Sequence, residues 1–129
     1  MIYVLDTNAW SDAFRGSAKL NRKISTVPAA RILLAAPVLY ELRRAVPQMR
    51  AREWRKAIDE LVSIYEVAQL DMYASEAAAR IGLDLRRRGR TINHLDALVA
   101  GIASAREATL VSRDKDFSAV SGLHAEDWS

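Results

Sequence analysis

Apolar runs of strand length recur along this chain, separated by stretches with helical spacing. Each run is four to six residues long and has the β-branched, aromatic or aliphatic composition of a buried strand. We predict strands at residues 2–5, 32–36, 65–70 and 108–112, and a short final strand at 123–127. These runs predict a sheet at the centre of the fold.

The stretches between the runs are predicted to be helical. Residues 9–27 have a weak helical pattern that Gly16 and Ser17 divide into two short helices. Pro37 suits the first turn of a helix, and Asp71 and Asn93 can cap two later helices. Three further stretches carry an apolar face. These faces are Trp54, Ala57, Ile58 and Leu61 within 47–63, then Ala74, Ala78, Ile81 and Leu85, and then Leu95, Leu98, Val99 and Ile102.

The alternation of strands and helices favours an α/β fold with a mainly parallel sheet, because parallel neighbours need connections of helical length. The chain contains no internal repeat, low-complexity segment or linker-like stretch. We therefore expect residues 1–129 to form a single domain.

Four acidic residues are expected at one edge of this sheet. Asp6 and Asp114 follow the first and fourth strands, and Glu41 lies about one helical turn beyond the second. Ligands of open α/β sheets bind outside the carboxyl ends of the strands. The helix before a parallel strand must descend from that edge. The helix that follows Asn93 therefore begins at the same edge, and Asp96, three residues after Asn93, lies in its first turn.

Each of these acids alone has an ordinary structural explanation, as a helix cap, a turn residue or an exposed helical residue. Together they imply strong mutual repulsion, for which a hard divalent cation such as Mg²⁺ or Mn²⁺ is the usual compensation. We therefore predict a metal site at this edge. Thr7, Asn8 and Ser112 are equally suited to orient its ligands or water and to cap local structure.

Positive charge is concentrated in arginine, since the chain has 15 Arg, 4 Lys and a formal net charge of +3. Arginine favours bidentate contacts with phosphate. Clusters lie at residues 43–44, 50–56 and 86–90, and each alone is most simply a solvated helix face. Three such clusters around an acidic site favour a polyanionic substrate and phosphodiester hydrolysis. The cluster nearest Asp96 in the chain consists of Arg86, Arg87, Arg88 and Arg90.

Composition excludes several other classes of protein. The absence of Cys excludes disulfide scaffolds, thiol catalysis and cysteinyl zinc sites. No basic segment precedes the first apolar run, so we expect no secretory signal and a cytoplasmic protein. No uncharged stretch is longer than that of residues 97–105, which has nine residues, whereas a membrane-spanning helix needs about 20. We therefore expect no membrane-crossing segment.

Four segments, taken in order, resemble the motifs of a PIN domain and, more narrowly, of a VapC-type toxin from a toxin–antitoxin module. They are Val4-Leu5-Asp6-Thr7-Asn8, Glu41 after a strand, Asn93 to Ala100, and Leu110 to Phe117. The resemblance covers the whole chain. It identifies Asp6, Glu41 and Asp96 with the first three acids of the family.

The resemblance implies a Rossmann-like, three-layer α/β/α sandwich with a mainly parallel central sheet. It also implies endoribonuclease activity that depends on Mg²⁺ or Mn²⁺, with tRNA or ribosomal RNA as the substrate. A homodimer is implied, together with a cognate antitoxin whose C-terminal segment wraps the toxin and approaches the acidic site. Larger toxin–antitoxin assemblies are consistent with it.

The fourth acid of the family aligns with either Asp114 or Asp116. We favour Asp114, because it is nearer the end of the strand. The alternative is that the loop folds back at once, so that Asp114 caps a short helix and Asp116 lies over the site.

Three other functions fit parts of the sequence. A metal-independent ribonuclease would use His94 and His124 as acid and base. A phosphoacceptor receiver domain needs an acidic acceptor after a central strand, but no Asp occurs between Asp12 and Asp59. The remaining possibilities are an RNA-processing nuclease of the same fold outside any toxin–antitoxin module, and a scaffold that binds RNA without cutting it.

Overall fold

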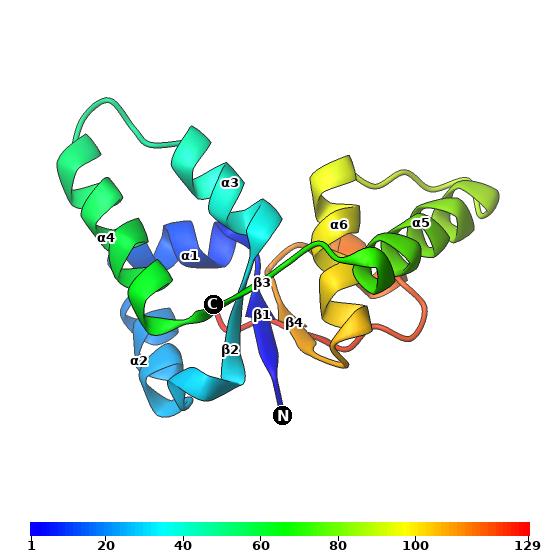
Figure 1. Cartoon of the computed structure of the whole chain (residues 1–129), viewed down its shortest axis with the longest axis horizontal. Helices are drawn as coiled ribbons and strands as arrows, with labels where there is room; N and C mark the ends of the chain where they lie inside the picture. The colour runs from blue at the N-terminus through cyan, green and yellow to red at the C-terminus, as the bar shows by residue number, and fades with distance from the viewer.

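The computed structural model describes residues 1–129 and contains a five-stranded parallel sheet (Figure 1). Its strand order is β3-β2-β1-β4-β5, and every neighbouring pair is parallel. The strands are β1 (Tyr3–Leu5), β2 (Ile32–Ala35), β3 (Glu66–Ala68), β4 (Thr109–Val111) and β5 (Ala125–Glu126). The predicted α/β class and parallel sheet are confirmed, with strands one to three residues shorter than the sequence indicated.

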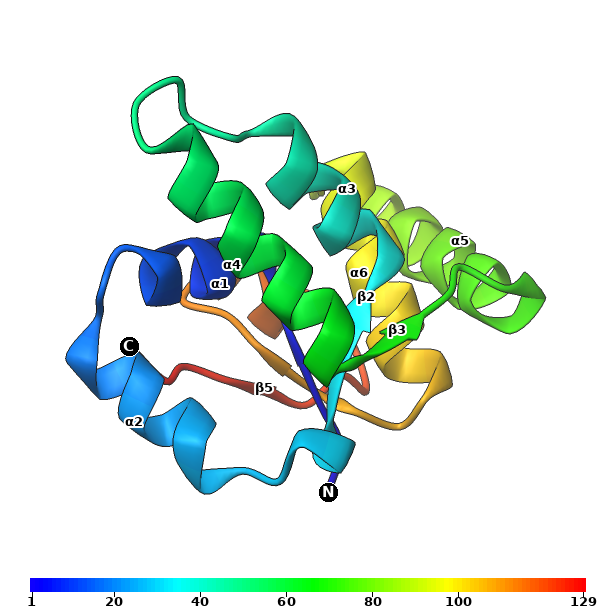
Figure 2. The ribbon, with the colours of Figure 1, turned by 60° about the vertical axis from the view of Figure 1, so that its left-hand side comes forward.

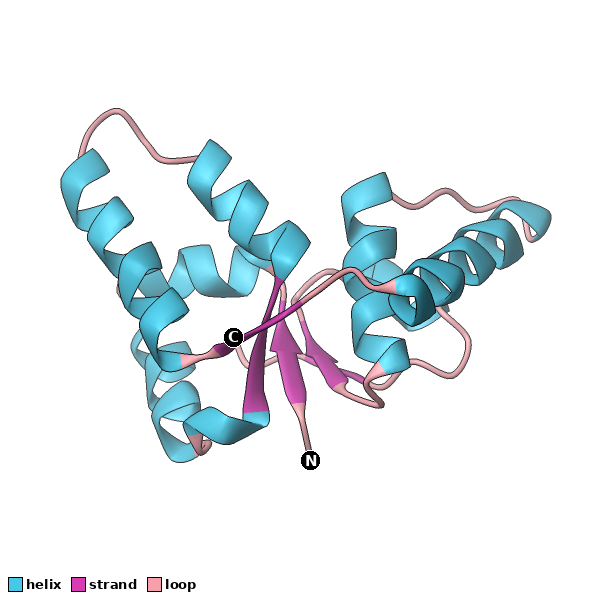
Figure 3. Cartoon of the chain, viewed as in Figure 1, coloured by secondary structure: helices cyan, strands magenta, loops and turns pink.

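Helices cover both faces of the sheet and give the predicted three layers (Figure 3). One group of helices lies on one side of the sheet and a second group on the other (Figure 1). The first group is α1 (Thr7–Phe14), α2 (Ala18–Thr26), α3 (Ala36–Arg44) and α4 (Ala51–Ile64). The second group is α5 (Met72–Arg87) and α6 (His94–Ala105), and the short 3-10 helices are η1 (Ala29–Arg31) and η2 (Lys115–Ala119). None of these helices is long and apolar enough to cross a membrane.

Local signals in the sequence set most helix starts. Pro37 lies in the first turn of α3, Asp71 accepts a hydrogen bond from the backbone N–H of Ala74, and Asn93 accepts one from Leu95. The helix expected from residue 47 begins only at Ala51. Arg50 has a left-handed φ of 66°, which a helix does not tolerate, and its carbonyl accepts the first bond of α4.

The core lies between the sheet and the helices of each side. The central strands β1, β2 and β4 contribute its most buried aliphatic side chains. The C-terminal tail crosses to α2, where the ammonium of Lys23 lies 5.5 Å from the centroid of the Trp128 ring (Figure 2). On the other face α5 packs so closely on α6 that a Cβ added at Gly101 would lie 2.6 Å from the Ala74 carbonyl oxygen and from Ala78 Cβ. The α5–α6 contact therefore depends on a glycine in α6.

We predict that Gly101→Ala destabilises the protein by about 1–3 kcal/mol, since the backbone of α5 must move to accommodate the added methyl group. The measurement is urea unfolding followed by circular dichroism. Gly82→Ala in α5 is the matched control, because a Cβ there meets nothing within 4 Å. That variant is expected to gain about 0.5–1 kcal/mol from helix propensity. Equal unfolding midpoints for the two variants would contradict the close α5–α6 contact.

Candidate active site at the carboxyl edge of the sheet

The ends of β1 and β4 bring Asp6 and Ser112 together. Leu5 pairs with Val111 in the parallel register, and the next residue of each strand begins a loop. The Asp6 backbone N–H donates to the Val111 carbonyl oxygen at 3.0 Å. Because β1 and β4 are the strands between which the connections reverse direction, this is where a ligand site of an α/β sheet is expected.

Asp6 is buried, with 5% of its surface exposed, and both of its carboxylate oxygens have partners. Oδ1 accepts a hydrogen bond from the Ala9 backbone N–H at 2.9 Å and so caps α1. Oδ2 accepts one from the Ser112 hydroxyl, which itself accepts the Asp114 backbone N–H at 2.9 Å. Burial raises the pKa of Asp6 despite these hydrogen bonds. Ser112 therefore connects the first and fourth acidic segments.

Glu41 reaches the same region from α3. The Thr7 hydroxyl, in the first turn of α1, donates to Glu41 Oε1 at 2.7 Å. This bond fixes one carboxylate oxygen of Glu41 beside the end of β1 and leaves Oε2 free. Asn8, the other polar residue of this turn, is exposed and takes no part in these hydrogen bonds. Of the three predicted supporting residues, Thr7 and Ser112 contact an acid and Asn8 does not.

Asp96 lies in the first turn of α6, and the chain gives its carboxylate no stabilising hydrogen bond. Its pKa is raised to about 6, first by burial and then by repulsion from Glu41, Asp114, Asp6 and Asp116. An acid is repelled in this way only by acids that lie near it. The structure thus brings all four predicted acids together from β1, α3, α6 and the loop after β4.

The loop after β4 agrees in part with both predictions for the fourth acid, namely Asp114 near the strand end and a loop that folds back so that Asp114 caps a helix. It does fold back at once, because Asp114 caps η2 and accepts the Asp116 backbone N–H at 2.9 Å. Asp114 nevertheless stays half-buried near the cluster, whereas Asp116 is exposed. Asp114 also raises the pKa of Asp96 more than Asp116 does. Capping and proximity to the other acids are therefore compatible at Asp114.

The cluster fits a hard cation in its donor chemistry. No three Asp, Glu, His or Cys side chains lie close enough to hold an ion together, so a cage of protein ligands is not preformed. Mg²⁺ usually binds through one or two carboxylates and keeps several waters, and Asp96 supplies a carboxylate with no competing donor. A divalent cation would relieve the repulsion that raises the pKa of Asp96.

The predicted arginine cluster lies at the end of α5 and is not uniform. Arg88 donates to Asp84 Oδ2 at 2.7 Å and to the Ala119 carbonyl oxygen at 2.6 Å, so it ties α5 to the η2 segment. Arg87 is exposed in the last turn. Arg86 and Arg90 line a pocket between α5 and α6 that the sequence did not predict. The one sequence signal for that pocket is a glycine inside α5.

Comparisons with known proteins match nearly the whole chain to one family. Residues 3–123 match the model of the PIN domain family. The chain is 27% identical to the tRNA(fMet)-specific endonuclease VapC of Shigella flexneri, over 98% of each chain. It is 28% identical to ribonuclease VapC2 of Rickettsia felis, over 99% of this chain and 98% of the relative.

The fold also matches solved structures over its whole length. The crystal structure of VapBC2 from Rickettsia felis bound to a DNA fragment from their promoter gives a TM-score of 0.91 at 24% identity, with both chains fully covered. The crystal structure of DNA-bound VapBC from Salmonella typhimurium gives 0.91 at 22% identity, over 100% of this chain and 99% of that one. At these identities the likeness establishes the fold alone.

We predict that Asp96→Asn stabilises the metal-free protein at pH 7. The wild-type carboxyl must ionise against a folded pKa of about 6, whereas its unfolded value is near 3.8. The folded state therefore binds the proton more tightly, so wild-type stability falls as the pH rises from about 4 to 6. Since Asp96 is half-exposed, the gain after discounting for solvent screening is about 1 kcal/mol.

The measurement is urea unfolding in EDTA at pH 4, 5, 6 and 7. The advantage of the variant should be complete at pH 7 and vanish near pH 4. Glu60→Gln on the exposed face of α4 is the control and should match the wild type throughout. A variant less stable than the wild type at pH 7 would mean that Asp96 is not repelled by its neighbours.

Proposed function

This chain belongs to the PIN domain family, and from that membership we propose that it is a metal-dependent endoribonuclease acting as the toxin of a toxin–antitoxin pair. The observation that supports this most directly is the convergence of Asp6, Glu41, Asp96 and Asp114 at one sheet edge, where burial and then neighbouring acids raise the pKa of Asp96. Such a cluster lowers the stability of the folded protein when no cation or ligand is bound there. It suits a protein that binds a divalent cation and a phosphate there.

In the proposed mechanism Asp6, Asp96 and Asp114 would hold Mg²⁺ or Mn²⁺, directly or through water. The cation, when bound, polarises a phosphate oxygen and favours ionisation of water. Glu41, fixed at one oxygen by Thr7, has its second oxygen free to accept a hydrogen bond from the attacking water. Ser112 keeps the Asp6 carboxylate in place and the Asp114 backbone beside it.

RNA is the proposed substrate. Removing the four clustered acids from a formal net charge of +3 leaves the rest of the chain strongly basic, and such a surface attracts a polyanion. We propose phosphate contacts from the cluster Arg86, Arg87, Arg88 and Arg90, with Arg88 contributing least because Asp84 already occupies it. A loop of tRNA or ribosomal RNA is the proposed target, since single-stranded loops expose bases for recognition. The relative from Shigella flexneri is named for tRNA(fMet).

The partners we propose are a VapB-type antitoxin and a second copy of this chain. Support comes from relatives named VapC and from structural neighbours that are VapBC complexes. We propose a cytoplasmic location and a single domain spanning residues 1–129. An RNA-processing nuclease outside a toxin–antitoxin module, or a non-catalytic RNA-binding scaffold, would be favoured if the product of no neighbouring gene bound the chain.

We predict that cleavage of total tRNA requires Mg²⁺ or Mn²⁺ and that Asp6→Asn and Asp96→Asn each lower its rate by about 10²-fold or more. The Mg²⁺ concentration needed for half-maximal cleavage should also rise below pH 6, because protonation of Asp96 in the metal-free protein competes with binding of the cation. The assay is gel analysis of RNA fragments with EDTA, followed by excess Mg²⁺. Full activity of a folded Asp6→Asn variant, or activity in EDTA, would refute the proposed mechanism.

We further predict that Asp114→Ala raises the Mg²⁺ concentration needed for half-maximal cleavage by about tenfold or abolishes cleavage, whereas Asp116→Ala has a mild effect. The reason is that Asp114 lies nearer the cluster and repels Asp96 more strongly. Loss of the η2 cap is a separate effect, so urea unfolding of both variants accompanies the titration. The opposite ranking at equal stability would make Asp116 the fourth acid.

A further inference from the structure

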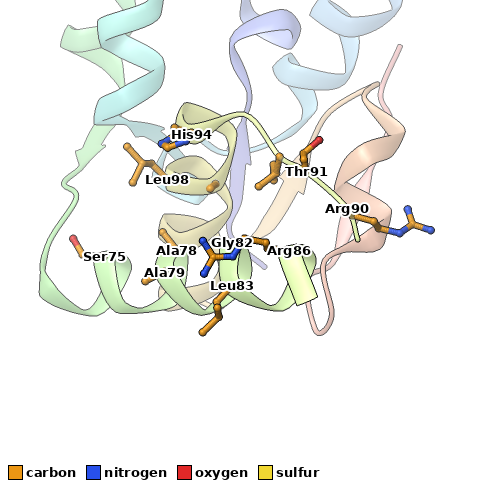
Figure 4. Close-up of a pocket in the computed structure, with 12 residues that line it drawn as sticks. Ser75, Ala78, Ala79, Gly82, Leu83, Arg86, Arg90, Thr91, His94 and Leu98 are labelled. Atoms are coloured by element: carbon orange, nitrogen blue, oxygen red, sulfur yellow. The ribbon is translucent and has the colours of Figure 1, made fainter. Parts of the chain in front are cut away.

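A cavity of about 570 Å³ opens between α5 and α6 (Figure 4). This volume lies within the range of small-molecule sites. Its wall is half apolar, with Leu83 from α5 and Ile92 and Leu98 from the segment that follows. Its polar groups include Thr91 and His94. The cavity therefore combines apolar side chains with hydrogen-bonding groups.

Gly82 lines this cavity from the middle of α5, and no contact explains a glycine there. Its backbone is helical, and an added Cβ would meet nothing within 4 Å. At Gly101, by contrast, the neighbouring helix leaves no room for a Cβ. A helical glycine costs about 0.5–1 kcal/mol relative to alanine. The glycine leaves the cavity open at this position, because no side chain projects into it.

Of the two arginines that line this cavity, Arg86 is the one whose guanidinium lies over it. Figure 4 shows its side chain turned back along α5 toward Ala78 and Gly82, over the pocket, whereas the guanidinium of Arg90 points away. Arg88 is occupied by Asp84 and the Ala119 carbonyl oxygen. Arg86 thus differs from its neighbours in the cluster, because its planar guanidinium faces the cavity and can contact a ligand there.

The cavity adjoins the acidic site through α6. His94, Ala97 and Leu98 form one wall of it, and Asp96 lies in the same helical turn. Because successive helical residues are about 100° apart around the axis, Asp96 projects from nearly the opposite face of α6, and this helix separates a ligand in the cavity from the carboxylate cluster.

We propose that this cavity binds one unstacked nucleobase of the RNA substrate, on the other side of α6 from the acidic cluster, with Arg86 contacting the base plane or its phosphate. The proposal rests on the proposed ribonuclease function and names a subsite of it. Proteins read single-stranded RNA by taking bases into apolar pockets and stacking them on arginine planes. A second copy of the chain fits less well, because a twofold interface centred here would bring two copies of Arg86 and Arg90 together.

Filling the cavity tests the proposal. Gly82→Leu should unfold at a higher urea concentration than the wild type, since it replaces a helical glycine. The same variant should lower kcat/KM for Mg²⁺-dependent cleavage of total tRNA by about tenfold or more, equivalent to about 1.4 kcal/mol. Gly82→Ala should give a smaller loss. Arg80→Leu, an exposed position of α5 outside this cavity, is the control for an added leucine and should leave kcat/KM unchanged.

Removing the positive charge of Arg86 gives an independent test of the proposal. Arg86→Gln should weaken binding of a fluorescein-labelled single-stranded 12-mer RNA about tenfold and reduce the slope of log Kd against log salt by about 0.7. Binding is measured in the Asp96→Asn background to prevent cleavage. Arg80→Gln removes an equal charge from the same helix and should leave Kd unchanged.

The outcomes separate this subsite from the proposed function. Wild-type cleavage with unimpaired Gly82→Leu and Arg86→Gln variants would overturn the subsite alone. A change from dimer to monomer in Gly82→Leu with unaltered kcat/KM would make the cavity a protein interface and overturn it too. If the wild type binds RNA without cutting it, loss of binding in Gly82→Leu would support the subsite while ribonuclease activity fails. A wild type that neither binds nor cuts RNA overturns both.

Discussion

Repulsion among carboxylates governs the carboxyl edge of this sheet. Asp6, Glu41, Asp96 and Asp114 come from four different elements, and the pKa of Asp96 rises to about 6, first because it is partly buried and then because the other acids repel its charge. Hydrogen bonds from Ser112, Thr7 and the start of α1 hold two of these acids in spite of the repulsion. The surrounding fold therefore supplies the free energy that keeps the charges together, and a cation would lower that cost.

Parallel topology is what makes such a cluster predictable from sequence. The apolar run that stops before Asp6 predicts where β1 ends. The direction of α6, which must descend before β4, predicts that Asp96 lies at the carboxyl edge. Neither inference needs side-chain detail, because both follow from strand direction. The short length of β3 and the start of α4 at Ala51 were harder to predict from the sequence, since they depend on loop geometry such as the left-handed backbone of Arg50.

Features that depend on side-chain contacts across the fold were not accessible from the pattern. Four arginines at the end of α5 were predicted to share one role, but Arg88 is bound to Asp84 and to η2, and only Arg86 turns over the cavity. Asp114 was expected either to cap a helix or to join the acids, and it does both. The two helical glycines look alike in sequence and differ completely in what surrounds them. Such distinctions arise from how α5 packs on α6.

The most direct test of this account is the pKa of the Asp96 carboxyl, measured by carbon-13 NMR of selectively labelled protein with and without Mg²⁺. The account predicts a value of about 6 in EDTA and a fall toward or below the ordinary range when Mg²⁺ is added, because the cation favours the ionised form. A value near 3.8 in EDTA that Mg²⁺ does not change would contradict it. That result would mean that the four carboxylates neither repel one another nor bind a cation as a group.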